Sequence, residues 1–126
     1  MTEPEQRSRL HLAMAGLTGA AGVAAAAAAA HGGEERLMGA VALVCLTHAP
    51  AFLALSARKP PLLLLIASLA MLAGLLLFCG DLAMRALHGA GLFPMAAPSG
   101  GTTLIAAWLL VAIQAVLPAR GSRDGG

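Results

Sequence analysis

The stretch PLLLLIASLAMLAGLLLF, residues 61–78, runs for 18 residues without a charged side chain. As an α-helix it would be roughly 27 Å long at about 1.5 Å per residue, close to the thickness of the hydrocarbon core of a bilayer. Pro60 and Pro61 mark its start, because proline is tolerated in the first turn of a helix. The stretch predicts a transmembrane helix, with a more polar extension up to residue 87.

Three further apolar segments lie at residues 10–30, 37–56 and 101–117, each close to the length of about 20 residues that crosses a bilayer. The chain is 59% hydrophobic and 11% charged, with a mean hydropathy of +0.82, whereas globular chains are roughly 45–50% apolar and about 25% charged. We therefore predict an all-α fold in which residues 1–126 form a single membrane domain, a bundle of four transmembrane helices. Residues 118–126 are expected to form a polar C-terminal tail.

The first segment consists largely of alanine and glycine, so it is only weakly hydrophobic and needs packing partners. Gly16, Gly19 and Gly22 recur at every third position and allow neighbouring backbones to approach closely. We assign the same packing role to Gly74 in the third segment. The small-residue surface predicts a central place for the first helix in the bundle.

A cleavable signal peptide is the alternative interpretation of this segment, because Arg7 and Arg9 precede an apolar run that ends in alanines before His31. The run is longer than the roughly 7–15 apolar residues typical of such a signal. Its repeated small residues also suit permanent helix packing. A retained helix is therefore favoured.

The basic residues predict the orientation of the bundle, because Lys and Arg collect on the cytoplasmic side of membrane proteins. Arg36 and Arg85 fall on one side of a four-span arrangement, and the other six basic residues fall on the opposite side. These six are Arg7, Arg9, Arg58, Lys59, Arg120 and Arg123. We expect both termini in the cytoplasm, with the first and third connections on the outside.

Asp81 and Arg85 follow the apolar part of the third segment, four residues apart on one helix face. The length of that apolar part places them at or beyond the outer interface, where the pair is weak and the arginine reaches into the headgroups. Alternatively, Asp81 turns inward, where an intramembrane carboxylate often marks an ion or proton route. The first interpretation is favoured, although the sequence does not define the rotation of the helix.

His48 lies near the middle of the second segment, where an imidazole must find a partner. Pro50 follows two residues later and removes the hydrogen bond to the carbonyl of Leu46, which favours a kink. The favoured interpretation is a histidine that hydrogen-bonds a backbone oxygen or a neighbouring hydroxyl and fixes the packing. A proton relay or ligand-binding role is the alternative.

Metal and redox sites are not expected. Cys45 and His48 share a helix face, but two ligands do not complete a metal site. Cys79 is placed at the outer end of the third helix and Cys45 roughly 12 Å inside the second, so we expect the two cysteines not to meet. Haem is not expected, because His48 has no second histidine at its depth.

The outer surface offers a weaker metal hypothesis. His31, Asp81 and His88 supply nitrogen and oxygen ligands there, but histidines in loops at an interface are more often solvated. We therefore predict neither a metal nor any other cofactor.

The third connection, HGAGLFPMAAPSGG at residues 88–101, is apolar yet rich in proline and glycine, so it is expected not to form a continuous helix. Ser99 is a candidate cap for the fourth helix. Further along, Trp108 is expected to be a packing anchor, and Gln114 an interhelical hydrogen-bonding group.

Four stretches carry a resemblance to a known family: AAAHGG at 28–33, LTHAPAFLAL at 46–55, LFCGDLAMRAL at 77–87 and APSGGTTLIAAWLL at 97–110. In order and character they resemble the YgdD-type family of small bacterial inner-membrane proteins, a domain-of-unknown-function family. The resemblance covers most of the chain and implies four transmembrane helices and no established activity.

The most specific parts of the resemblance are the placement of His31 and His48 and a turn that precedes a tryptophan. That turn is formed by Pro98, Ser99, Gly100 and Gly101, followed by Trp108.

This chain departs from the family pattern at two places. Val44 and Cys45 stand where the family commonly has Tyr-Gln, and the residues from Cys79 to Ala83 replace a SGSLY-like stretch. If the missing hydroxyl and amide groups formed a family site, that site is altered here. Asp81 and Arg85 are then local replacements or simple interface residues.

Three classes of function remain. A structural or accessory membrane protein, packing against lipid, other membrane proteins or itself, fits the lack of a catalytic constellation. A small transporter or proton-linked carrier would use His48 and perhaps Asp81. An enzyme is least expected, because no nucleophile–base pair, phosphate-binding loop or full metal set is present in the sequence, and nothing suggests nucleic-acid binding.

Overall fold

The structure is a computed structural model that describes residues 2–57 and 59–118. Within these residues the chain forms four helices and no strand: α1 (Glu3–His31), α2 (Glu35–Ser56), α3 (Leu62–His88) and α4 (Ala96–Val116). Each helix is long and apolar enough to cross a membrane. The predicted all-α bundle of four transmembrane helices is therefore confirmed, and the fold is that of a multi-pass membrane protein.

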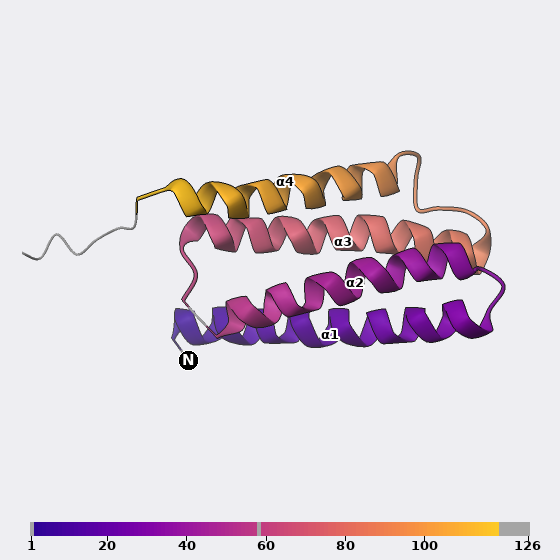
Figure 1. Cartoon of the computed structure of the whole chain (residues 1–126), viewed down its shortest axis with the longest axis horizontal. Coiled ribbons are helices and arrows are strands. Elements are labelled where there is room, and N and C mark those ends of the chain that lie inside the picture. Colours follow the sequence, from indigo (N-terminus) through magenta and orange to yellow (C-terminus); the bar gives the residue numbers. More distant parts are fainter. Residues whose placement is uncertain (1, 58, 119–126) are drawn as a thin grey trace, which may run out of the picture.

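Successive helices run in opposite directions (Figure 1). The start of α1, the connection between α2 and α3 and the end of α4 lie together at what we call the terminal end of the bundle. The other two connections, residues 32–34 and 89–95, lie at the opposite end, which we call the loop end. Three of the six basic residues used to predict the orientation, Arg58, Arg120 and Arg123, lie outside the described residues, as does most of the polar tail.

The helices associate as two hairpins. Helix α1 packs closely along α2, and α3 along α4, whereas the two hairpins meet more loosely where α2 lies against α3 (Figure 1). The prediction that the first helix is central is wrong. The short connection after α1 places this helix beside α2, and only one face of α1 makes that contact. Most of the alanine-rich stretch of α1 is therefore exposed.

Helix α1 begins seven residues before its apolar segment because its first turn is capped. The Thr2 side chain accepts a hydrogen bond from the Glu5 amide, and the Glu5 carboxylate accepts one from the Thr2 amide. This reciprocal pair satisfies two amide groups that have no partner within the helix. Helix α3 likewise continues past its apolar core and ends at His88. The residue that caps it is Gly89, whose φ of 76° lies in the left-handed region that favours glycine.

Helix α4 begins at Ala96, five residues before the predicted start of the fourth segment. The expected turn at Pro98, Ser99, Gly100 and Gly101 is therefore wrong, because these residues form the first turns of the helix. Proline is compatible with this position, since the first amide groups of a helix have no partner inside it. The expected Ser99 cap is also wrong. Met95 is the capping residue, with φ of 70° and no side-chain hydrogen bond.

Small residues allow close approach within each hairpin. A Cβ atom at Gly22 would lie 2.7 Å from the Leu46 side chain in the α1–α2 hairpin. In the α3–α4 hairpin, a Cβ at Gly74 would lie 2.9 Å from the carbonyl oxygen of Gly100. Gly19 makes only an ordinary contact with Ala49. Gly16 is exposed, and a Cβ placed there would meet no atom within 4 Å, so Gly16 does not mediate close helix packing within the bundle, contrary to the prediction.

Candidate functional site

His48 is held between the two hairpins and is only 7% exposed. Its Nδ1 atom lies 2.7 Å from the Val44 carbonyl oxygen on its own helix. On the other side, the Trp108 indole N–H of α4 donates to its Nε2 atom at 3.0 Å. The two rings are tilted by 58° with centroids 5.6 Å apart. His48 therefore joins α2 to α4.

This pair of contacts defines the state of the imidazole. A carbonyl oxygen only accepts hydrogen bonds and an indole N–H only donates, so Nδ1 carries the hydrogen and Nε2 accepts. Both ring nitrogens of His48 are satisfied by protein groups in the neutral Nδ1–H form. A further proton on Nε2 would face the indole N–H and break the hydrogen bond.

A second buried histidine, His11, was not recognised from the sequence. It is fully buried on α1, with Nδ1 2.7 Å from the Arg7 carbonyl oxygen and Nε2 2.9 Å from the Ser68 hydroxyl of α3. The same hydroxyl lies 2.8 Å from the Leu65 carbonyl oxygen. The available signal was that His11 and Ser68 are polar residues set in apolar surroundings near the same end of the bundle.

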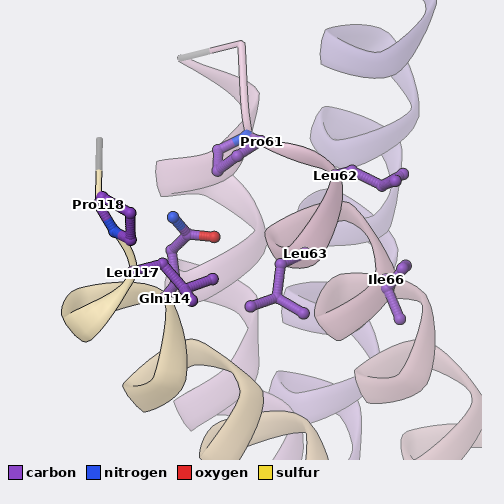
Figure 2. Close-up of a pocket in the computed structure, with 7 residues that line it drawn as sticks. All are labelled: Pro61, Leu62, Leu63, Ile66, Gln114, Leu117 and Pro118. Atoms are coloured by element: carbon purple, nitrogen blue, oxygen red, sulfur yellow. The ribbon is translucent and has the colours of Figure 1, made fainter. Parts of the chain in front are cut away.

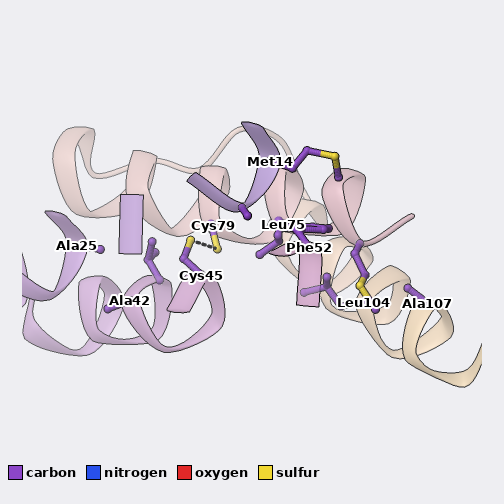
Figure 3. Close-up of a cluster of buried hydrophobic side chains, with 12 residues drawn as sticks. Met14, Ala25, Ala42, Cys45, Phe52, Leu75, Cys79, Leu104 and Ala107 are labelled. Carbon is purple, nitrogen blue, oxygen red and sulfur yellow. Dashed lines mark hydrogen bonds between the residues drawn. The ribbon is translucent and has the colours of Figure 1, made fainter. Parts of the chain in front are cut away.

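Cys45 and Cys79 lie together, contrary to the prediction. Both are buried free cysteines whose Sγ atoms are 3.6 Å apart across α2 and α3 (Figure 3). The prediction placed Cys79 at the outer end of the third helix, just past its apolar core, but α3 runs nine residues further, to His88. Cys45 is ten residues from the start of α2 at Glu35 and Cys79 is nine from the end of α3, so antiparallel helices bring them to one level.

Asp81 is fully buried, so its side chain turns into the bundle, and its depth at the outer interface stays a prediction. One carboxylate oxygen accepts from the Arg85 Nε at 2.8 Å, and the other accepts from the Leu92 backbone amide at 2.8 Å. The connection that follows α3 folds back so tightly that a Cβ at Gly91 would overlap the Asp81 carboxylate. Asp81 turns inward, as in the alternative interpretation, but it fastens the α3–α4 connection to α3.

Arg85 is paired but only partly enclosed, since 47% of its side chain is exposed. The pairing of Asp81 with Arg85 four residues later agrees with the expected helix-face contact. His31 and His88 are exposed at the loop end, so His31 is not a buried polar group. No cluster of three or more metal-binding side chains occurs among residues 2–57 and 59–118.

Gln114 lines a groove of about 440 Å³ at the terminal end, between the start of α3 and the end of α4. Its amide lies among Pro61, Leu63, Leu117 and Pro118 (Figure 2). The expected interhelical hydrogen bond of Gln114 is not formed with any described residue. The part of the helix that carries it lies at an open end of the bundle, where the amide is partly exposed.

Two other grooves are more apolar. One lies between α1 and α2 and includes Pro50 and Gly16 in its lining. The other, of about 470 Å³, lies between α1 and α3, with Cys45 and Cys79 among mostly aliphatic side chains. The linings of these three grooves include neither His48 nor Asp81, and so none of them is a polar route between the two.

The comparisons with known proteins identify a family rather than an activity. Residues 25–101 match a family model described as "Protein of unknown function (DUF423)". This region includes His48, both cysteines and the Asp81–Arg85 pair, whereas Trp108 and Gln114 follow it. No curated protein and no solved structure matches the chain.

Proposed function

The chain belongs to the DUF423 family of proteins of unknown function, and from that premise we propose that it is a structural or accessory protein of the bacterial inner membrane. In this proposal it catalyses no reaction and holds no cofactor. It acts by packing its helices against another membrane protein or a second copy. The YgdD-type resemblance and the family match agree on a family of unknown function.

The enclosure of His48 is the observation that carries the proposal. Its ring nitrogens are both satisfied by protein groups, and its side chain is buried. Asp81 is likewise bonded to Arg85 and to the Leu92 amide. A carrier needs polar groups that water or substrate can reach, whereas these groups hold helices and a connection together.

The exposed face of α1 supports an accessory role. Ala24, Ala26 and Ala27 are exposed, while Ala25 between them is buried against the bundle. In a bilayer, a surface of small side chains lets another helix come close, and close backbone approach is a main source of helix association there.

Photo-crosslinking in native membranes tests this role. A photoreactive residue at Ala24 should give adducts with another membrane protein or with a second copy of the chain, whereas one at Ala25 should not. Ile105, exposed on α4, is the lipid-facing control. Adducts with lipid alone at Ala24, as at Ile105, would contradict the proposal.

A proton-linked carrier is the second candidate, and the burial of a histidine and a carboxylate within membrane-spanning helices favours it. It is tested in sealed vesicles that contain the purified protein and a pH-sensitive dye. The accessory proposal expects proton flux equal to that of empty vesicles. Flux above that level, lost in His48→Gln, would establish the carrier instead.

We further propose that both termini face the cytoplasm. Lys59 is at the terminal end and His88 is exposed at the loop end. In intact cells, a membrane-impermeant thiol reagent should label His88→Cys and leave Lys59→Cys unlabelled. Labelling of Lys59→Cys alone would reverse the orientation.

A further inference from the structure

The two cysteines of the chain stand at the contact between the hairpins. Cys45 is on α2, in the first hairpin, and Cys79 on α3, in the second. Their Sγ atoms, 3.6 Å apart, face each other in Figure 3. A disulfide has an S–S distance of about 2.05 Å, so the sulfur atoms need to approach by only about 1.5 Å.

The two thiols are buried within the bundle, but they can be reached through the groove between α1 and α3. Cys45 is 5% and Cys79 9% exposed, yet both belong to the lining of the α1–α3 groove. The remaining lining is aliphatic apart from Thr18, and it includes Leu17 and Leu76, which are highly exposed. In a membrane this groove opens toward the acyl chains rather than toward water.

We propose that Cys45 and Cys79 form a reversible redox site in which a quinone-type lipid oxidises the dithiol through the α1–α3 groove. Two S–H bonds break and one S–S bond forms. The two protons and two electrons pass to the quinone, whose two carbonyl oxygens become the hydroxyls of a hydroquinone. The disulfide then joins the two hairpins covalently. An uncharged, lipid-soluble dithiol restores the two thiols by exchange and is itself oxidised to a disulfide.

The character of the groove selects the class of oxidant. A charged, water-soluble disulfide such as oxidised glutathione would have to lose its hydration to reach thiols lined by aliphatic side chains. An uncharged quinone partitions into the same apolar layer as the groove and accepts two electrons, which matches the stoichiometry of one disulfide. The site therefore takes a lipid-soluble two-electron oxidant.

The test uses the full-length protein, reduced and then placed in lipid vesicles without oxygen. One sample receives a fully substituted short-tailed ubiquinone, which cannot alkylate thiols, and a parallel sample receives oxidised glutathione. After denaturation, a maleimide reports free thiols and intact mass reports the chain. We expect the quinone to abolish labelling and to give a monomer lighter by two hydrogen atoms, with one hydroquinone formed per chain. Oxidised glutathione should leave both thiols labelled.

Two variants serve as controls. Cys45→Ser should keep Cys79 labelled under both conditions. The double variant Cys79→Ala/Ala73→Cys keeps two thiols but moves one about 9 Å along α3, to an exposed position outside the lining of the groove, and both should stay labelled. Retention of two labels in the wild-type chain after quinone treatment would overturn the proposal. Equal oxidation by oxidised glutathione would contradict the claim that the oxidant arrives through the groove. Oxidation of the double variant would contradict the claim that the reaction depends on the contact between Cys45 and Cys79.

Discussion

The contacts within the hairpins and the contacts between them differ in emphasis. Among the described residues, one side-chain hydrogen bond, from the Ser8 hydroxyl to the Ser56 carbonyl oxygen, joins α1 to α2, whereas three side-chain pairs join the two hairpins. Within a hairpin, glycines such as Gly22 and Gly100 bring two helices close. Between the hairpins, side-chain pairs that run along the bundle accompany a shared apolar core, which includes Phe52 of α2 and Met71 of α3. These pairs are His11 with Ser68, Cys45 with Cys79, and His48 with Trp108.

The difference teaches how a small membrane bundle acquires a defined arrangement. Lipid is as apolar as a leucine side chain, so apolar burial does not select which faces of two hairpins meet. Glycine contacts provide dispersion over a long interface within each hairpin. The connection between the hairpins, residues 57–61, is shorter than the one within the second hairpin, residues 89–95, so connection length does not separate the two kinds of contact. Between the hairpins, directional hydrogen bonds select one face and one register. The buried polar groups of this chain act in that selection.

Gly100→Ala should have the largest effect, because it breaks the tightest contact within a hairpin. The new Cβ would lie 2.5 Å from the Phe78 backbone nitrogen and 2.8 Å from the Gly74 carbonyl oxygen, and neither backbone atom moves cheaply. We expect a loss of about 3 kcal/mol of unfolding free energy, measured by denaturant titration in lipid–detergent micelles.

Gly101→Ala is the matched control for this change. Its Cβ would lie 3.8 Å from the Phe78 ring, an ordinary contact. We expect a change within about 0.5 kcal/mol. Equal losses for Gly100→Ala and Gly101→Ala would contradict close approach at Gly100 as the cause, because the higher helix propensity of alanine favours the folded state at both positions.

The pair between α2 and α4 is probed by a double-mutant cycle. His48→Leu and Trp108→Phe each remove one partner of the 3.0 Å hydrogen bond. Each should cost about 1–3 kcal/mol through the polar group left without its partner, and the coupling between them should be about 0.6–1.7 kcal/mol. Additive losses would mean that the two residues do not act together, and the account of the contact between hairpins would lose its central pair.

Ser68→Ala should have a smaller effect of about 1 kcal/mol, because it removes the hydroxyl beside the His11 Nε2 but leaves the Nδ1 contact intact. Thr102→Ala is the control, since the exposed Thr102 hydroxyl bonds only the Pro98 carbonyl of its own helix. Unfolding titrations of both variants compare a contact between hairpins with a local one. A larger loss for Thr102→Ala would reverse the comparison.

Arg85→Gln is expected to have the smallest effect, below about 1 kcal/mol, because the guanidinium is half exposed and its attraction to Asp81 is screened. The Leu92 amide should stay bonded to Asp81, so hydrogen exchange at Leu92 should change little. Rapid exchange of the Leu92 amide hydrogen in Arg85→Gln would instead show that Arg85 is needed to keep the α3–α4 connection bonded to Asp81.

Hydropathy and length were sufficient to predict the four helices, because each apolar segment is long enough to cross a bilayer and charges or prolines separate the segments. The same reasoning misplaced the start of α4. It treated Pro98 and the glycines as breakers, although proline fits a first turn and Gly100 is required by close approach to α3.

The candidate site was only partly predictable for a geometric reason. Composition indicates that His48 is buried, but its partner Trp108 is 60 residues away. Whether Asp81 faces the bundle depends on the rotation of α3 about its axis. Because α3 is apolar on all sides, its hydropathy pattern does not indicate which side faces the other helices. The cysteine contact was missed because the end of the apolar core was taken as the level at which the neighbouring helix begins, which placed Cys79 too far outward relative to Cys45.

The hydrogen bond from Trp108 to His48 tests the central claim most directly, and the single tryptophan of the chain makes it a clean probe. Solid-state NMR of the ¹⁵N-labelled protein in lipid bilayers measures the coupling between the Trp108 Nε1 and His48 Nε2 atoms and the exchange of the indole proton with D₂O. We predict a measurable coupling, an Nδ1–H tautomer of His48 and a protected indole proton. A rapidly exchanging indole proton with no coupling would contradict the account, because His48 would then face water rather than join the two hairpins.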